Sequence, residues 1–368
     1  MSGTRQKLNV GLIGCGVISG IYLENLRKFG AVDVVACSDL IPEMATAVAD
    51  ASPGVRAMTT DELLADDSVD IVLNLTQPKY HFEVMKAGIE AGKHVYGEKP
   101  LSVSFEESAQ LMAMAERAGV RVGCAPDTFL GAGFQTCREL IDRGMIGEPV
   151  AATAFFTSHG TENWHPAPFF YYQPGGGPML DMGPYYLNTL VNLMGPARSV
   201  SGSARITFPQ RTITSEPLNG TRIEVEVPTH VSGTVDLASG AIATVLTTFD
   251  LWGANLPFIE IYGSEGSLSV PNPNNFGGPV RVLTRSSNEW KEVPVSRPFA
   301  GNSRGLGVAD MAAGIASGGP HRASGALASH VLEMMHAFGQ SADSGRRIEL
   351  TTTCDRPSPL PVDMLVYG

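Results

Sequence analysis

The 368-residue chain has few cysteines, few basic residues and no long apolar run. Its five cysteines are scattered without a Cys-x-x-Cys pair, so neither a disulfide framework nor a zinc ribbon is predicted. Acidic residues outnumber lysine and arginine by 37 to 26, which argues against nucleic acid or an anionic membrane as a partner, since both require clustered basic residues. No segment approaches the roughly 18 apolar residues of a membrane span. The polar residues 1–7 lead into no signal-like segment, so we expect a cytoplasmic protein.

What the chain does have is length and apolar content. Hydrophobic residues make up 43% of the sequence, which is enough for a large core. A chain of 368 residues exceeds one ordinary domain, and two are predicted. Alternating strand and helix patterns give way to a strand-rich sequence near residue 125, so the two domains are predicted at 1–125 and 126–368.

Apolar runs alternate with amphipathic segments through residues 1–125. We expect strands at 8–13, 32–37, 70–75, 94–96 and 120–124, and helices at 19–29, 42–50, 79–91 and 105–118. This alternation predicts a doubly wound parallel sheet, the architecture of an α/β Rossmann dinucleotide-binding domain.

The remainder of the chain is rich in strands that are separated by Gly, Pro and Asn turns. We expect strands at 150–157, 200–208, 221–237, 241–248, 258–262, 267–270, 280–284 and 292–295. Helices are expected at 134–142, 306–316 and 326–342. The pattern predicts an α+β domain with a large, mainly antiparallel open sheet.

A glycine motif, Gly14-Cys15-Gly16-Val17-Ile18, stands between the first strand and the first helix. A side chain at Gly14 or Gly16 would block the turn or hold the backbone away from a pyrophosphate, which binds the free N–H groups of a helix start. A tight turn without a ligand is the alternative for such a motif. Its place in the first βαβ unit favours a dinucleotide site formed by Gly14 to Ile18.

Asp39 ends the second strand, 39 − 16 = 23 residues after Gly16. A carboxylate there can accept hydrogen bonds from the adenosine ribose and repels a 2′-phosphate. No arginine follows directly to bind that phosphate, so NAD is favoured over NADP. The alternative is that Asp39 only caps a loop.

Two further motifs resemble those of one known family. The first runs from Asn74 to Pro78, through His81 and Ala91-Gly92-Lys93-His94-Val95, to Glu98-Lys99-Pro100; the second is Gly-Gly-Gly-Pro-Met-Leu-Asp-Met-Gly at 175–183. Their order and separation resemble the glucose–fructose oxidoreductase / inositol dehydrogenase (Gfo/Idh/MocA) family over nearly the whole chain. The resemblance implies an NAD-binding first domain and a second domain for substrate binding and oligomerisation.

In that family the lysine of the Glu-Lys-Pro motif lies beside the nicotinamide and the reacting hydroxyl. The resemblance thus implies that Lys99 binds substrate and stabilises developing alkoxide charge. Glu98 is expected on the nicotinamide side of the cleft, and Pro100 is expected to fix the backbone that aims the lysine. Further cofactor contacts are expected from Thr76, Pro78 and His81.

The second motif departs from the commonest family pattern, Asp-x-Gly-x-His-x-x-Asp. Tyr185 replaces the histidine and Asn188 replaces the second acid, while Asp181 is kept. The family has a branch with tyrosine at this position, which implies that Tyr185 handles the proton. Residues four apart share one face of a helix, so Asp181 and Tyr185 are expected together. Since tyrosine titrates near pH 10, this role would require Lys99 nearby to lower its pKa.

His165 competes for the proton-handling role from a polar aromatic loop, 161–166, or else hydrogen-bonds a sugar. Further substrate contacts are expected from Gln135, Trp164 and Asn188. No histidine–carboxylate spacing indicates a metal site.

These residues predict an NAD-dependent dehydrogenase that oxidises a secondary alcohol of a sugar, sugar derivative or cyclic polyol. The alternative is a redox-neutral enzyme with tightly held NAD, such as a glycosidase or a substrate–substrate oxidoreductase. A third reading is a non-catalytic NAD or sugar sensor. The resemblance also implies a homo-oligomer, either a dimer or a tetramer.

Overall fold

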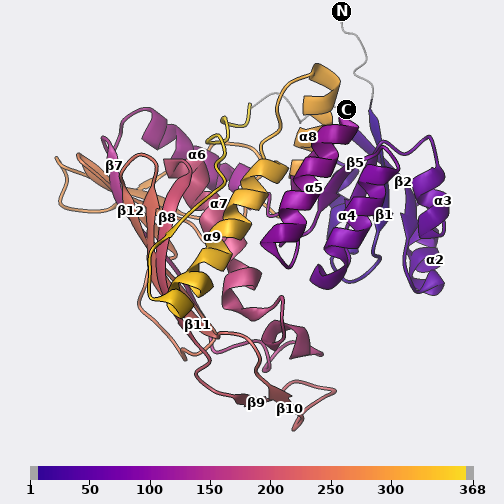
Figure 1. The fold of residues 1–368 in the computed structure, drawn as a ribbon. Coiled ribbons are helices and arrows are strands. Elements are labelled where there is room, and N and C mark those ends of the chain that lie inside the picture. Colours follow the sequence, from indigo (N-terminus) through magenta and orange to yellow (C-terminus); the bar gives the residue numbers. More distant parts are fainter. Residues whose placement is uncertain (1–6, 362–368) are drawn as a thin grey trace, which may run out of the picture. The chain divides into compact units, whose positions relative to one another are not determined.

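The computed structural model describes residues 7–361, which form two compact units (Figure 1). The first unit comprises residues 7–130, 302–329 and 358–361, and the second comprises 131–301 and 330–357. The sequence-based boundary after residue 125 lies near the first crossing between units. Residues 302–329, which the sequence pattern assigned to the second domain, pack with the first unit.

The first unit is built on a six-stranded parallel sheet in the order β3-β2-β1-β4-β5-β6. The strands are β1 (Leu8–Ile13), β2 (Val32–Ser38), β3 (Arg56–Ala57), β4 (Ile71–Asn74), β5 (His94–Gly97) and β6 (Val122–Cys124). Because β1 pairs with both β2 and β4, the strand order reverses there. Ligands of doubly wound sheets bind at the carboxyl ends of the strands beside such a reversal. The predicted Rossmann architecture is confirmed.

The helices of this unit are α1 (Ser19–Leu26), α2 (Pro42–Asp50), α3 (Thr60–Ala65), α4 (His81–Glu90), α5 (Phe105–Ala118) and α8 (Leu306–Ser317). Helices α4 and α5 lie side by side, and α4 packs on β4 and β5 (Figure 1). A capping box begins α5, where the Ser104 side chain accepts from the Glu107 N–H and the Glu107 carboxylate accepts in return. The sequence missed α3 and β3, which are only six and two residues long.

The second unit carries a nine-stranded sheet in the order β16-β15-β14-β13-β7-β12-β11-β8-β17. Its strands are β7 (Pro149–Thr157), β8 (Ala197–Arg205), β11 (His230–Leu237), β12 (Ile242–Thr248), β13 (Ile259–Gly263), β14 (Gly266–Val270), β15 (Val280–Thr284), β16 (Lys291–Val293) and β17 (Ile348–Glu349). Only β7 and β12 pair in parallel, so the prediction of a mainly antiparallel sheet is confirmed.

The expected strand at 221–237 is two strands rather than one. Its first part is β10 (Arg222–Glu224), which pairs with β9 (Gln210–Thr212) in a separate ribbon, and its second part is β11. Pro228 lies in the break and has no N–H to donate to a ladder. The sequence pattern did not predict β9.

The helices of the second unit, α6 (Ala132–Asp142) and α7 (Gly177–Met194), pack on one face of the large sheet. A last helix, α9 (Gly325–Ser344), spans the division between the units. Along β12, Ala243 and Val245 are fully buried whereas Ile242 and Thr244 are exposed. This alternation shows that the helices cover one face of the sheet and leave the other open.

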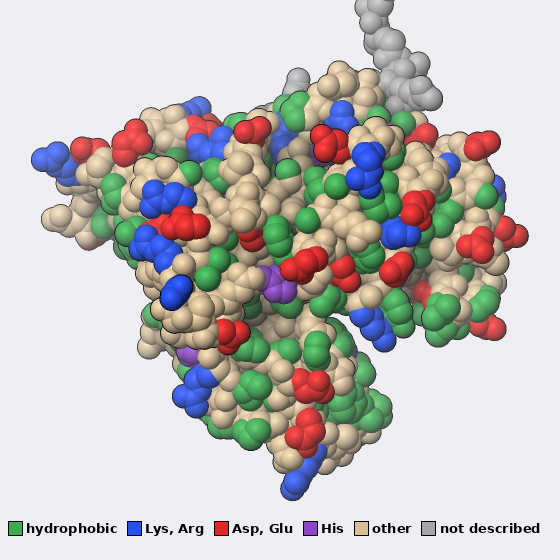
Figure 2. Space-filling view, in the orientation of Figure 1, with side chains coloured by type: hydrophobic (Ala, Val, Ile, Leu, Met, Phe, Trp, Pro, Cys, Tyr) green, Lys and Arg blue, Asp and Glu red, His purple; other side chains and the backbone are tan. Residues whose placement is uncertain are grey.

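Acidic and basic side chains are interspersed on the face drawn in Figure 2, and no basic patch gathers there. Within residues 7–361, no helix is both long and apolar enough to cross a membrane.

Candidate functional site

The glycine loop at the carboxyl end of β1 has one glycine that the fold requires and one that it does not. Gly14 has φ +101°, and an added Cβ would lie 2.7 Å from the carbonyl carbon of Leu75. A Cβ on Gly16 would meet nothing within 4 Å. The protein itself therefore gives no reason for a glycine at 16. A dinucleotide phosphate that approaches the backbone at this point would supply one.

The start of α1 fits an anionic group. Ser19 closes the turn, since its hydroxyl donates to the Gly16 carbonyl at 2.7 Å and its N–H donates to the same oxygen at 3.0 Å. The helix N-cap, Ile18, supplies no side-chain hydrogen bond, and the Val17 side chain is fully exposed beside it. First-turn N–H groups that lack a side-chain partner are the usual binding site of a pyrophosphate. Cys15 is buried, so only its backbone faces this site.

Asp39 holds the glycine loop in place. One carboxylate oxygen accepts from the Cys15 N–H at 2.7 Å, and the other accepts from the Ile41 N–H at 2.9 Å. Asp39 therefore caps this loop, which does not exclude a contact with the ribose. A carboxylate has about four acceptor sites, so these two bonds leave capacity for ribose hydroxyls.

His81 lies at the start of α4 and is almost completely buried. Its Nδ1 is 2.6 Å from the Pro100 carbonyl oxygen, and its Nε2 is 2.9 Å from the Thr76 carbonyl oxygen. Burial lowers the pKa of His81, whereas these two carbonyls, which only accept hydrogen bonds, favour the doubly protonated ring. The imidazole therefore joins the loop after β4 to the loop after β5. This placement favours a positioning role over direct contact with a dinucleotide.

Thr76 and Pro78 lie in the loop that His81 holds. The Thr76 hydroxyl donates to Oδ1 of the buried Asn74 at 2.6 Å, and Pro78 begins a short 3₁₀ turn, Pro78–Tyr80. Both residues follow the carboxyl end of β4, directly beside the reversal of strand order. Their position is the one expected of cofactor-binding residues.

Glu98 and Lys99 follow the carboxyl end of β5. One Glu98 oxygen accepts from the Tyr22 hydroxyl at 2.7 Å, and the other accepts from the Lys99 N–H at 2.9 Å. Both oxygens of Glu98 are therefore engaged in fixing the Glu-Lys-Pro segment, whose Lys99–Pro100 peptide is cis. Lys99 itself is half-buried. Sequence reasoning missed Tyr22, because only the fold brings α1 beside this loop.

Asp127 is a second residue that the sequence analysis missed. It is buried, and one of its oxygens accepts from the N–H groups of Gly305 and Gly307 at 2.9 Å each. Burial raises the pKa of Asp127 to about 6. The residue ties the start of α8 to the end of β6. The sequence signal that could have identified Asp127 is an acidic residue three positions after the predicted strand at 120–124.

In the second unit, α7 carries Asp181, Tyr185 and Asn188. The sequence pattern predicted no helix at these residues, although the shared face expected for Asp181 and Tyr185 assumed one. Asp181 is half-buried, while Tyr185 and Asn188 are 7% and 3% exposed. At Gly183 the helix packs closely against α9, since an added Cβ would lie 3.1 Å from Sδ of Met335. One turn of a helix separates Asp181 from Tyr185, so their side chains share a face.

His165 is half-buried in the aromatic loop and near Asp181. Burial lowers the pKa of His165, and the charge of Asp181 opposes that shift. Its Nδ1 accepts a hydrogen bond from the Ala167 N–H at 3.0 Å. In the neutral ring the proton is therefore on Nε2. In this state His165 can donate to a ligand oxygen at Nε2 but cannot take a proton there.

The remaining expected substrate residues differ in accessibility. Trp164 is 61% exposed and meets the His165 ring edge-on, with 5.4 Å between centroids. Gln135 on α6 is 3% exposed. No group of three or more potential metal ligands occurs in the part of the chain that the structure describes.

Comparison with known proteins gives two family matches. Residues 8–125 match the oxidoreductase family with an NAD-binding Rossmann fold, and residues 134–269 match the GFO/IDH/MocA C-terminal domain. The 1,5-anhydro-D-fructose reductase of Ensifer adhaerens is 28% identical over 70% of this chain and 74% of its own length. Inositol 2-dehydrogenase 3 of Saccharopolyspora erythraea is 26% identical over 77% and 80%.

Solved structures share the fold. An NAD-binding oxidoreductase from Klebsiella pneumoniae superimposes with a TM-score of 0.82 at 24% identity, covering 94% of this chain and 99% of that one. Levoglucosan dehydrogenase in complex with NADH and L-sorbose gives 0.80 at 23%, covering 94% and 100%. The Rossmann domain confirms the expected cofactor, NAD. The chain is a member of the Gfo/Idh/MocA family of NAD-binding oxidoreductases.

Proposed function

We propose that the protein is an NAD-dependent dehydrogenase that oxidises a secondary alcohol of a sugar, sugar derivative or cyclic polyol. The observation that carries the proposal is the fixed Glu-Lys-Pro segment, which holds Lys99 at the carboxyl edge of the sheet, after the strand that pairs with β4. Two relatives support the substrate class, since one is named for an anhydro sugar and the other for inositol.

NAD supplies the hydride acceptor when bound, and the start of α1 and Asp39 would hold its pyrophosphate and ribose. Lys99 would stabilise negative charge on the reacting oxygen. Tyr185 is assigned to accept the hydroxyl proton, and Asp181 to orient the substrate. His165 is assigned as a hydrogen-bond donor, because its Nδ1 is engaged by Ala167.

We also propose that NAD is preferred over NADP. The Asp39 carboxylate would repel a 2′-phosphate, and the next residues, Leu40, Ile41 and Pro42, bring no positive charge to this loop. Equal binding of both cofactors would contradict this part of the proposal.

A cytoplasmic homo-oligomer completes the proposal. Of the five thiols, four are buried and none is in a disulfide, as in reducing compartments. The open face of the large sheet presents exposed Ile242 and Thr244 and half-buried Leu246 with few charges. A second copy would cover this face. Thr244→Arg should lower the molar mass measured by light scattering, and an unchanged mass would count against this interface.

The direct test is a screen of sugars and polyols with NAD and with NADP, followed by absorbance at 340 nm. We expect NADH to form with at least one sugar or cyclic polyol, and NADP to serve less well. Substrate conversion without any absorbance change, by enzyme that retains NAD after desalting, would favour the redox-neutral alternative.

A further inference from the structure

The second unit contains a cavity of about 490 Å³ that no part of the proposed chemistry uses. It lies among the loop that follows β7, the ribbon strand β9 and the loop that follows β12. Its lining residues are His159, Glu162, Asn163, Phe208, Gln210, Arg211, Thr212, Thr214 and Trp252. The volume is in the range of small-molecule binding sites.

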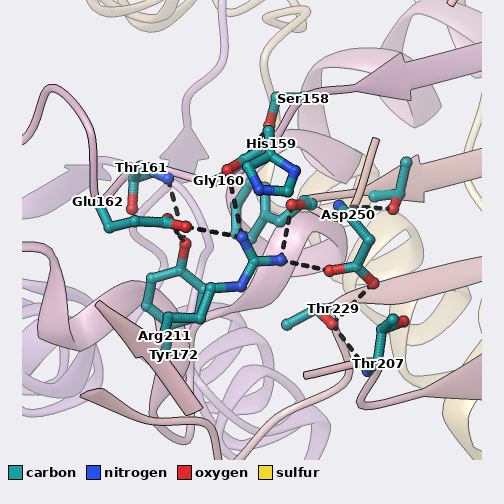
Figure 3. A network of polar contacts seen from close by, with 12 residues as sticks. Ser158, His159, Gly160, Thr161, Glu162, Tyr172, Thr207, Arg211, Thr229 and Asp250 are labelled. Atoms are coloured by element: carbon teal, nitrogen blue, oxygen red, sulfur yellow. Dashed lines mark hydrogen bonds and ion pairs between the residues drawn. The ribbon is translucent and has the colours of Figure 1, made fainter. Parts of the chain in front are cut away.

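One wall of the cavity is a buried ion network centred on Arg211 (Figure 3). One terminal nitrogen of Arg211 donates to Glu162 at 2.7 Å and to the His159 carbonyl at 3.2 Å. The other donates to Asp250 at 2.5 Å and to the Phe249 carbonyl at 2.8 Å. The hydroxyl of Tyr172 donates to Glu162 on the other side.

This wall carries no excess positive charge. A buried guanidinium that is held by two carboxylates leaves a formal charge of −1 on the three side chains, so an anion would be repelled rather than bound. Both carboxylates are themselves engaged by Arg211, which weakens their attraction for a cation. The ligand that fits such a wall is uncharged.

An aromatic platform borders the cavity. The indole of Trp252 is 86% exposed and lies flat on the His159 ring, with 3.4 Å between centroids and 16° between planes. On the ribbon side, Phe208 is 43% exposed, and its ring is covered by the Arg211 guanidinium at 5.2 Å. Large aromatic rings left this open on a folded chain mark a binding surface more often than a random apolar residue does.

The other lining groups are neutral hydrogen-bonding side chains. Asn163 and Gln210 are exposed amides, and Thr212 and Thr214 are hydroxyls. The Gln210 amide donates one N–H to Glu224 at 2.7 Å, which leaves its other N–H and its carbonyl oxygen for a ligand. Amides and hydroxyls both donate and accept, which is what a ring of sugar hydroxyls requires. A flat indole beside such groups suits the C–H face of a pyranose.

We propose that this cavity binds an uncharged sugar ring, stacked on Trp252 and hydrogen-bonded by Asn163 and Gln210. The inference goes beyond the proposed dehydrogenase activity, because nothing in that activity requires a second carbohydrate site within the second unit. The cavity shares a loop with His165. Ser215 donates to the His165 carbonyl at 2.6 Å, and the Thr214 N–H donates to the Glu162 carbonyl at 2.9 Å.

The test is calorimetric titration of the full chain with D-glucose, cellobiose and maltose, without NAD. We expect at least one sugar to bind, and Trp252→Ala to weaken its binding about ten-fold or more, the scale of one lost aromatic contact. Gln210→Ala should weaken the same binding. The matched control is Trp290→Ala, a 37% exposed tryptophan outside the cavity, which should leave affinity unchanged.

Two results would overturn the proposal. In the first, wild type and Trp252→Ala bind every sugar equally. In the second, Trp252→Ala lowers the molar mass in solution and changes no sugar affinity, which would assign the aromatic surface to a second copy of the chain. Lys99→Ala separates this site from the proposed function, because it should lower kcat strongly and leave Trp252-dependent sugar binding intact. Since Trp252 is 86% exposed, its loss should not prevent folding.

Discussion

At the scale of single residues, Lys99 is the side chain on which the proposed chemistry depends most. We expect Lys99→Ala to lower kcat by about 10²–10⁴, the usual size of an electrostatic or proton-transfer contribution. Affinity for NAD should change little. The control is Lys79→Ala, which removes an exposed lysine that lies over the Tyr80 ring at 4.8 Å. If both variants resemble wild type in steady-state kinetics, Lys99 has no role in catalysis and is only a charged residue of the loop.

Mutation can show whether Tyr185 or His165 accepts the proton of the substrate hydroxyl. If Tyr185 is the base, Tyr185→Phe removes one hydroxyl and should lower kcat by about 10²-fold or more. His165→Ala should then raise KM, as expected for a group that binds ground and transition states equally. The pH–rate profile of each variant decides between them. A nearly silent Tyr185→Phe, with a His165→Ala enzyme that has lost its low-pH ionisation, would transfer the role to His165.

At the scale of structural elements, substitutions in the β1–α1 turn should distinguish a glycine needed for NAD binding from one needed for stability. Gly16→Val should weaken NAD binding by about 10²-fold or more while the free energy of unfolding changes by no more than about 0.5 kcal/mol, because an added Cβ meets nothing within 4 Å. Gly14→Ala should lose stability as well, since its φ is +101°. Gly339→Ala, at another glycine with open space around it, is the control for NAD affinity, which it should leave unchanged. Isothermal titration and denaturant unfolding measure the two effects; undiminished NAD affinity in Gly16→Val would contradict the assignment.

Asp127, which connects the end of β6 to the start of α8, should make the stability of the protein depend on pH. Burial raises the pKa of Asp127 to about 6 from an ordinary value of 3.8. Between these values the native carboxyl holds a proton that the unfolded chain has lost, so stability falls as the pH rises through this window. Relative to wild type, Asp127→Asn should therefore gain up to about 3 kcal/mol between pH 4 and pH 6. Urea unfolding at several pH values measures this difference, and a constant difference would show that Asp127 does not titrate there.

The elements that sequence reasoning recovered are those with long, periodic patterns. Five of the six strands and the main helices of the first unit follow from apolar runs that alternate with amphipathic segments. The short ribbon strand β9 has only three residues, of which Arg211 alone is buried. A buried arginine in a polar stretch carries no periodic signal. Its partners, Glu162 and Asp250, are 49 and 39 residues away.

At the scale of the whole molecule, the sequence predicted two domains but not the return of residues 302–329 to the first unit. That return depends on tertiary contacts, including the bonds from Gly305 and Gly307 to Asp127. The candidate site shows the same limit. Motif spacing singled out Lys99, Asp181 and Tyr185 as candidates, whereas Tyr22 and Asp127 entered only through contacts between distant segments.

The central claim is that this protein moves a hydride from a carbinol carbon to NAD. Its most direct test uses the best sugar or polyol of the screen, carrying deuterium on each carbinol carbon in turn, with mass spectrometry of the NADH that forms. The account predicts that deuterium at one position appears in NADH, one atom per turnover. Deuterium that never leaves the sugar while product forms, or the absence of turnover with every sugar and polyol tested, would contradict it.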